Sequence, residues 1–404
     1  MTRPTTLLFL NLAHFLDHYF LLIFATAVLA IHPAWGMSYG EAFALGTPAF
    51  VAFAAGTLPS GWLGDRWGGT RMMRIFFIGL GLAAIAVGLA PGPIALALAL
   101  GMLGLFASIY HPVATAMVVG LADRPGRALG VNGVFGNLGV AAAALFTGVL
   151  TAAFGWRYAF IIPGSLTLLL GIVYAIGSRR SRLEGGHRPT ESPVSAAVET
   201  VGQGRVLFVV GVSALFGGLI FNGVTLALPK LFEERLSALA PDLLHVGALA
   251  ALAFALAAFA QIPVGRLLDR LGARPILLVA AGLQVPFLLL AGLASGAEVL
   301  LAAVPLMLLV FGEIPVTAWL IGRYTVPGWR SRAYGLVYLL SLGVSALVVP
   351  TIASLHERTG GSGALFMGLS LAALMIFGAA WALPGRRPVA AAGRPVAAHR
   401  ASPT

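Results

Sequence analysis

Two kinds of residue are scarce in this chain of 404 residues, and each scarcity excludes a class of protein. Cysteine is absent, which excludes disulfides and thiolate metal sites. Charged residues make up only 10% of the chain, whereas a soluble domain carries roughly 25%. Because 59% of the residues are hydrophobic, the composition indicates a protein whose surroundings are lipid rather than water.

Sequence patterns of several enzyme and binding classes are also missing. The chain has no glycine-rich phosphate loop with a lysine, which argues against direct use of ATP. It contains neither a nucleophile–base triad nor the paired carboxylates of a hydrolase, so we predict that it is not an enzyme and has no cofactor. The net charge of +11 comes from arginines spread over short loops, which favours a role in membrane topology over nucleic-acid binding.

Long apolar segments dominate the sequence. Twelve stretches of 18 or more nearly uncharged residues recur, each long enough to cross about 30 Å of hydrocarbon as a helix. We therefore predict an all-α integral membrane protein with twelve transmembrane helices. The first stretch has only Arg3 before it and polar residues inside it, so we expect a retained span rather than a cleaved signal peptide. The predicted spans cover approximately residues 5–31, 41–62, 72–90, 94–121, 128–154, 157–177, 206–232, 243–268, 275–295, 298–325, 331–355 and 362–383.

The basic residues predict the orientation of these spans. When alternate loops are assigned to one side, 21 of the 25 lysines and arginines fall on the side of both termini. The positive-inside rule places that side in the cytoplasm, so we expect a multi-pass protein of a bacterial-type inner membrane. We also expect the protein to be a monomer. The longest polar interruption separates six spans from six. The predicted units are an N-terminal bundle (1–177), a cytoplasmic linker (178–205), a C-terminal bundle (206–383) and a disordered cytoplasmic tail (384–404).

The two bundles are copies of one another. Residues 59–68 (PSGWLGDRWG) return 204 positions later at 263–272 (PVGRLLDRLG), with six of the ten positions identical. The tripeptide Leu-Gly-Val at 138–140 returns at 342–344, with the same offset. Each copy contains an even number of spans, so both have the same orientation in the membrane. This arrangement predicts two six-helix bundles related by a pseudo-two-fold axis along the membrane normal.

The repeated segment resembles the signature of a known family. The pattern Gly-x-x-x-Asp-Arg-x-Gly follows the second predicted span and returns after the eighth. Together with the number of spans and the repeat, it is similar to the major facilitator superfamily over roughly residues 5–383. The resemblance implies two bundles around a central cavity that opens alternately to each side. The residues that carry it are Gly61, Asp65, Arg66, Gly68 and Arg71, and in the second copy Gly265, Asp269, Arg270 and Gly272.

The chemistry of this motif indicates a cytoplasmic gate. Gly61 and Gly68 permit close helix approach and a tight turn. Asp65 can accept backbone N–H groups at a helix start and pair with a cation, for which we expect Arg127 in the next cytoplasmic loop. Such a cluster would hold the cytoplasmic ends of the halves together in one state and release them in the other. For the arginines, the alternative is that they only set the topology.

Polar and ionisable groups inside the spans are the candidate site residues, because such groups are costly in lipid and usually face a cavity. They fall in the first, fourth, seventh and tenth spans, and the family resemblance implies that these four spans line the cavity. The repeat aligns Asn222 with His18, and Glu313 with Tyr110. The candidates for substrate binding and proton coupling are His14, Asp17, His18, Tyr110, His111, Asn222 and Glu313.

Three interpretations of these residues stay open. Asp17, His111 and Glu313 could titrate as proton carriers, because burial changes the free energy of charging. His14 and His18 lie four residues apart on one helix face and could bind a transition metal together with His111 or Asp17. The histidines could instead satisfy backbone carbonyls or each other between helices, which would make them structural.

Narrower resemblances point to two substrate classes. The run 14–19, with Tyr110-His111-Pro112, is similar to fosmidomycin-resistance-type exporters, although the fifth span lacks the Gly-Pro pair of drug–proton antiporters. Residues 221–230, with the histidine pair, resemble bacterial copper importers, although the seventh and eighth spans lack the methionine pairs of those proteins. We predict a secondary transporter that moves a small solute by alternating access, driven by protons. A copper importer and a non-transporting membrane sensor are the alternatives.

Overall fold

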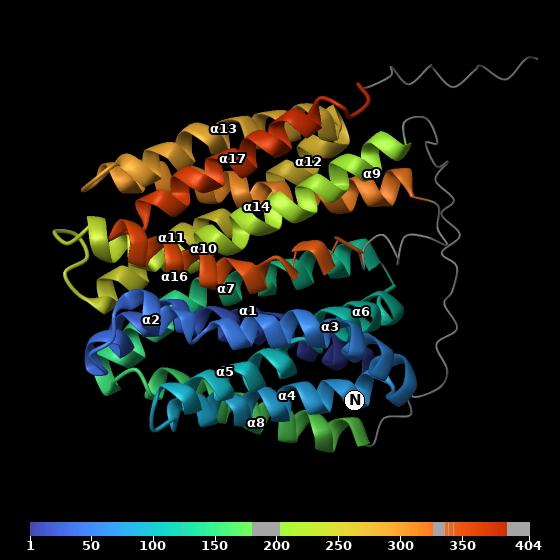
Figure 1. The fold of residues 1–404 in the computed structure, drawn as a ribbon. Coiled ribbons are helices and arrows are strands. Elements are labelled where there is room, and N and C mark those ends of the chain that lie inside the picture. Colours follow the sequence, from blue (N-terminus) through green and yellow to red (C-terminus); the bar gives the residue numbers. More distant parts are fainter. Residues whose placement is uncertain (124, 180–202, 326–335, 338, 342, 386–404) are drawn as a thin grey trace, which may run out of the picture.

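The structure, a computed structural model, describes residues 1–123, 125–179, 203–325, 336–337, 339–341 and 343–385. Every regular element within these ranges is a helix (Figure 1). Most of the predicted linker, most of the predicted tail and Leu342 of the second Leu-Gly-Val copy lie outside the described residues. The boundaries of the predicted units therefore stay predictions.

The N-terminal half begins with a long first helix, and its fourth span is interrupted by a short π-helix. Its elements are α1 (Arg3–Ala34), α2 (Tyr39–Ala44), α3 (Thr47–Trp67), α4 (Gly69–Gly88), α5 (Pro93–Ala107), η1 (Tyr110–Ala114), α6 (Thr115–Leu121), α7 (Pro125–Phe154) and α8 (Tyr158–Arg179).

The C-terminal half has a second π-helix, in the seventh span. Its elements are α9 (Gln203–Val212), η2 (Ser213–Gly217), α10 (Gly218–Arg235), α11 (Leu243–Ala258), α12 (Gln261–Leu271), α13 (Ala273–Leu293), α14 (Glu298–Tyr324), α16 (Ser345–Thr359) and α17 (Gly363–Ala380).

The described residues contain 12 helical segments long and apolar enough to cross a membrane, which confirms the predicted number. Most of their ends lie within a few residues of the predicted ones. The second span is longer than predicted and runs over α2 and α3, from Tyr39 to Trp67. The eleventh is described only from Leu339, so the start predicted at residue 331 lies outside the described residues.

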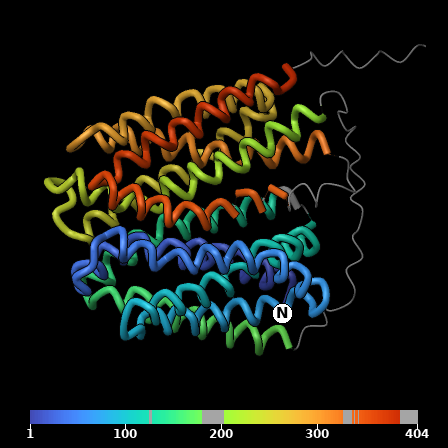
Figure 2. The backbone as a smooth tube through the Cα atoms, in the orientation of Figure 1, coloured from blue at the N-terminus to red at the C-terminus, as the bar shows by residue number. Residues whose placement is uncertain are grey.

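The helices form the two bundles that the repeat predicts. In Figure 1 the blue-to-green helices α1–α8 pack together as one layer, and the yellow-green-to-red helices α9–α17 pack as the other. Figure 2 shows the same division along the backbone trace. The bundles meet where α7 contacts α11, where α16 contacts α2 and α3, and where α1 contacts α10.

Small residues allow the closest crossing between the halves, at α7 and α11. A Cβ atom added to Gly148 of α7 would lie 2.7 Å from the carbonyl oxygen of Leu243, at the start of α11. Gly247 of α11 faces the backbone of Ala144 in the same way. In lipid, helix association relies on such close backbone packing because water exclusion contributes little. These glycines therefore set how closely the two halves approach.

The structure corrects the expected position of the motif. Asp65 and Arg66 do not lie in a loop after the second span, because α3 continues as a helix through Trp67. The connection to α4 is the single residue Gly68, whose φ of 86° lies in the left-handed region that favours glycine. Gly272 has the same role in the second copy, with a φ of 81°. Asp65 thus lies at the end of α3 and not at a helix start, so it does not cap α4.

Candidate functional site

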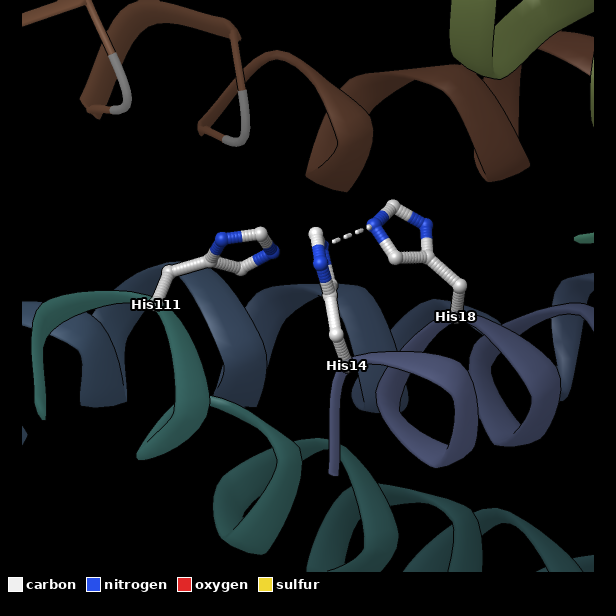
Figure 3. Close-up of side chains that lie close together, drawn as sticks. All are labelled: His14, His18 and His111. Carbon is white, nitrogen blue, oxygen red and sulfur yellow. Dashed lines mark hydrogen bonds between the residues drawn. The ribbon is translucent and has the colours of Figure 1, made fainter. Parts of the chain in front are cut away.

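Three imidazole rings converge on one side of the N-terminal half. His14 and His18 come from consecutive turns of α1, and His111 comes from η1 in the fourth span. Figure 3 shows the three rings pointing toward one another, away from the N-terminal helices and toward the brown ribbon of the C-terminal half. One ring nitrogen from each histidine lies within 4.8 Å of the other two. His14 and His18 are half-buried, whereas His111 is buried.

A backbone carbonyl fixes the tautomer of His14. Its Nδ1 atom lies 2.7 Å from the carbonyl oxygen of Asn132 in α7. A carbonyl oxygen only accepts hydrogen bonds, so Nδ1 carries the proton and Nε2 of the neutral ring presents a lone pair. That Nε2 atom lies 3.2 Å from Nε2 of His18 (Figure 3). The α7 backbone therefore aims the His14 lone pair at the second histidine.

Asn132 also holds the neighbouring polar groups. Its side-chain oxygen accepts a hydrogen bond from the Tyr110 hydroxyl at 2.9 Å, and its amide nitrogen donates to the side chain of Asn11 at 3.0 Å. The Tyr110 ring stacks on His14, with ring centroids 4.7 Å apart and planes inclined by 18°. The ring of His14 is thus fixed by a hydrogen bond at one edge and by an aromatic ring on one face.

The break in the fourth span positions His111. Pro112 has no backbone N–H, so the helix cannot make the regular hydrogen bond at this residue. The chain widens locally into the π-helix η1, a form that occurs often at functional sites. The widened turn brings Nε2 of His111 to 3.3 Å from Oδ2 of Asp17 on α1. The Asp17 side chain is completely buried, so its carboxyl group faces the histidine cluster and not water.

The C-terminal half contributes a separate polar pair. Glu313 of α14 is buried, and its Oε2 atom accepts a hydrogen bond from Nε2 of Gln284 in α13 at 2.9 Å. Its other oxygen faces Gly217 of η2, where an added Cβ would lie 3.3 Å away. Within the described ranges, no arginine, lysine or histidine forms an ion pair with Glu313. Glu313 is therefore an ionisable side chain inside a membrane-spanning helix, and its described hydrogen-bond partner is an uncharged amide.

Asn222 has a local role in this conformation. Its amide donates to the carbonyl oxygen of Gly218, one turn earlier in α10, at 2.8 Å, and more distantly to Ser341 at 3.4 Å. It shares no described hydrogen bond with the histidine cluster. The structure thus brings together His14, Asp17, His18, Tyr110 and His111, while Asn222 and Glu313 belong to the other half.

The motif residues lie at the end of the molecule where the chain begins. Arg66 stacks over Trp62 and Arg71 over Trp67, with guanidinium carbons 5.4 and 5.1 Å from the ring centroids. Asp65 and Arg127 are both exposed, and the expected pairing between them is absent from the described part of the chain. In the second copy, Asp269 accepts a hydrogen bond from the Trp319 indole at 3.3 Å. The gating role of the motif stays a prediction.

Polar contacts join the two halves at the opposite end. Oε1 of Glu357, in α16, accepts a hydrogen bond from the Gly40 N–H at 2.9 Å and another from the Ser38 hydroxyl. The Tyr39 ring lies 4.6 Å from the His356 ring, and the Lys230 ammonium lies 4.7 Å from the Tyr39 centroid. All described side-chain hydrogen bonds between the halves are at this end, opposite the motif. The halves are therefore closed together on the side away from the motif.

Sequence reasoning missed several of these residues. Asn132 and Gln284 are amides within apolar spans, and the same cost of burial that singled out the histidines and acids would have found them. Gly136 lies against the His14 ring, and Glu357 joins the halves. Neither residue has a local pattern that distinguishes it from the other glycines and loop acids.

Comparisons with known proteins agree with this architecture. The sequence model described as Major Facilitator Superfamily matches residues 7–350. A puromycin resistance protein of Streptomyces alboniger is 29% identical over 126 residues, which is 30% of this chain and only 25% of that relative. Among solved structures, an inward-facing, unoccupied bacterial homologue of the human lysosomal transporter Spinster is similar, with a TM-score of 0.71 and 16% identity over 94% of this chain and 97% of that one. The peptide transporter POT in complex with sulfate is also similar, with a TM-score of 0.74 and 16% identity over 93% of this chain and 94% of that one.

Proposed function

The chain belongs to the major facilitator superfamily, a family of membrane transporters, and from this premise we propose that it couples the movement of a small solute to protons. The protein is a multi-pass membrane transporter and not an enzyme. In the proposed mechanism the solute binds between the two bundles. The bundles then rock so that the site opens first to one side of the membrane and then to the other.

Glu313 is the observation that carries the proposal of proton coupling. Its carboxyl group is buried in a membrane span and has Gln284, an uncharged donor, as its described hydrogen-bond partner. Ionisable groups in such positions are expensive and mark substrate or proton pathways. The Glu313 side chain is neutral when protonated and charged when deprotonated. The two forms can favour different packing of α13, α14 and η2. Proton uptake and release would in this way bias which side of the membrane the site faces.

The arrangement of contacts supports alternating access. The polar contacts between the halves lie at the outer end, around Glu357 and Gly40, while the exposed motif residues lie at the other end. We propose that this conformation is the one closed to the outside. The conformation closed to the cytoplasm would bring the residues around Asp65 into contact and release Glu357. With the basic loops in the cytoplasm, the transporter would lie in a bacterial-type inner membrane with both termini inside.

Transport by the purified full-length chain in proteoliposomes tests the proposal. An imposed pH gradient is combined in turn with Zn²⁺, Cu²⁺, organic acids and hydrophobic drugs as solutes. We expect the gradient to drive accumulation of at least one of them. Glu313→Gln should abolish gradient-driven accumulation, yet it should preserve exchange of the same solute down its own concentration gradient, because the amide keeps the shape of the acid but carries no proton.

Glu298 provides a matched control for this experiment. It begins the same helix, α14, but is exposed at the membrane surface. Glu298→Gln therefore makes the same chemical change outside the proposed pathway and should leave accumulation as in the wild type. If no solute responds to the pH gradient, or if Glu313→Gln accumulates solute like the wild type, proton coupling through Glu313 is wrong.

A further inference from the structure

The histidine cluster has the geometry of a metal site. We propose that His14, His18 and His111 bind one divalent transition-metal ion, and that this ion is the transported solute. Metal binding is a property of the cluster alone, whereas the assignment of the ion as cargo rests on the proposed transport function. The donors are three imidazoles with a carboxylate beside them. Imidazole suits zinc, copper, iron and nickel, and the cysteine-free chain offers no thiolate that would favour a softer ion.

The distances fit such an ion with little movement. Zn–N bonds of about 2.0–2.1 Å place two ligand nitrogens of a tetrahedral ion roughly 3.3–3.4 Å apart, and never more than about 4.2 Å apart. The Nε2 atoms of His14 and His18 are already separated by 3.2 Å. All three nitrogens lie within 4.8 Å of one another, so the third needs to move by at most about 1.5 Å to reach the tetrahedral separation, which rotation of the His111 ring can provide.

The surroundings of His14 match those of a metal-binding histidine. Such residues almost always donate their second ring N–H to a carbonyl or carboxylate, which fixes the tautomer and orients the ring. His14 donates from Nδ1 to the Asn132 carbonyl, so its Nε2 lone pair points into the cluster. Nε2 of His14 can therefore only accept the hydrogen bond that joins it to His18, whose Nε2 carries the proton. A metal ion in the cluster would replace that proton and bind both Nε2 lone pairs.

Asp17 supplies the charge that a buried cation needs. A divalent ion in a membrane span is unfavourable unless negative charge lies beside it. The Asp17 carboxyl is completely buried on the same helix as His14 and His18, and its Oδ2 atom is 3.3 Å from Nε2 of His111. An ion among the three rings would therefore lie next to a carboxylate. If His111 binds the ion through Nε2, Asp17 can act as a fourth ligand; if it binds through Nδ1, Nε2 stays free to donate to Asp17, which then orients the ring.

Calorimetric titration of the full-length, detergent-solubilised chain with Zn²⁺ tests the site, using protein without a polyhistidine tag. We expect one ion per chain. Loss of a partner outside the ligand shell already weakens metal binding by about 10- to 100-fold, so His14→Ala, His18→Ala and His111→Ala should each weaken it by more than about 100-fold. His245→Ala removes an exposed histidine at the outer surface and should bind Zn²⁺ like the wild type.

The ligand identity is tested on the wild type, so that an unstable variant does not decide the result. Electron paramagnetic resonance of the chain loaded with one equivalent of Cu²⁺ should show coupling to several imidazole nitrogens. A spectrum without nitrogen coupling, or wild-type Zn²⁺ affinity in a folded His14→Ala, His18→Ala variant, would overturn the site.

Transport measurements separate the two proposals. Zn²⁺ uptake that fails in the His14→Ala variant supports the ion as cargo. Binding without uptake overturns the cargo assignment and leaves the metal site supported. Gradient-driven movement of an organic solute by a chain that does not bind Zn²⁺ overturns the metal site and supports the proposed function. If Zn²⁺ binds and moves without any response to the pH gradient, the metal inference holds and proton coupling fails.

Discussion

Gly136 of α7 lies directly against the imidazole of His14. A Cβ atom at this position would be 2.7 Å from Nε2 and Cε1 of the ring, closer than side-chain atoms pack. The glycine therefore leaves the space that lets His14 reach the Asn132 carbonyl. A backbone position on the fifth span thus determines how a histidine on the first span is oriented.

Gly136→Ala should displace the His14 ring and disrupt the histidine cluster without unfolding the protein. The ring can rotate away at low cost, but it then loses the hydrogen bond to Asn132. We expect Zn²⁺ affinity to fall by about 10- to 100-fold, the usual effect of losing an orienting partner, with little change in the melting temperature. Gly133→Ala is the control, because a Cβ there meets no atom within 4 Å. Equal Zn²⁺ affinities in the two variants would contradict this role for Gly136.

Removal of the Glu357 carboxyl should open the outer end. Glu357→Ala deletes the acceptor for the Ser38 hydroxyl and the Gly40 N–H. In the proposed mechanism the conformation closed to the cytoplasm lacks these contacts, so the change should destabilise only the conformation seen in this structure. Because the chain has no cysteine, spin labels on the exposed positions Ala34→Cys and Arg358→Cys can report the distance across this end. We expect a several-fold larger population of long distances.

A control for this variant is available on the same face of the protein. Asp242 is an exposed acid that bonds only within its own half, to His245 at the start of α11. Asp242→Asn should leave the distance distribution of the labelled protein unchanged. An unchanged distribution in Glu357→Ala as well would show that the carboxyl does not hold the halves together.

Asp65→Ala should lower transport while the amount of protein in the membrane stays the same. In the proposed inward-closed conformation Asp65 pairs with a cation, and an exposed ion pair contributes up to about 1 kcal/mol, or roughly a fivefold shift between conformations. The transport rate is measured in proteoliposomes and normalised to the reconstituted protein. Asp123→Ala, which removes another exposed acid near the same end, should transport normally. Normal transport by Asp65→Ala would remove the motif from the gate.

The stability of the first turn of α11 should depend on pH. The backbone N–H and the imidazole of His245 both hydrogen-bond the Asp242 carboxylate and lower its pKa. Since the folded-state pKa is the lower one, this cap is fully present above the ordinary carboxyl pKa and is lost as the pH falls through the lowered value. Hydrogen exchange at the His245 amide, corrected for its intrinsic rate, should accelerate over that range. Asp242→Asn keeps an uncharged cap, and its protection should not change with pH.

Much of the fold could be predicted, because lipid imposes strong local rules. A span must be helical and long enough to cross the hydrocarbon, so twelve spans could be counted from apolar runs alone. The ends were harder to place, since helices continue into water. The motif around Asp65 belongs to α3 and not to a loop for this reason. The candidate residues His14, Asp17, His18 and His111 were also predictable, because each is a polar group in an apolar run.

The partners of those residues were not predictable. Asn132 is 118 positions from His14, and Glu357 is 317 positions from Gly40. Which residues meet over such separations depends on the rotation of each helix about its axis and on how closely neighbours approach. Glycines such as Gly136 and Gly148 control that approach, and nothing in their local sequence separates them from the other glycines of the chain.

The sequence by itself determined the number of spans, the duplication, the family motif and the set of buried polar side chains. Charges and unpaired backbone N–H and C=O groups are unfavourable in lipid, and this cost applies to each segment separately. Only the tertiary structure decided that three histidines share one cluster, that Glu313 lies apart with Gln284, and that the halves are joined at the end opposite the motif. Those relationships arise from packing between helices, where the position of one ring depends on the backbone of another span.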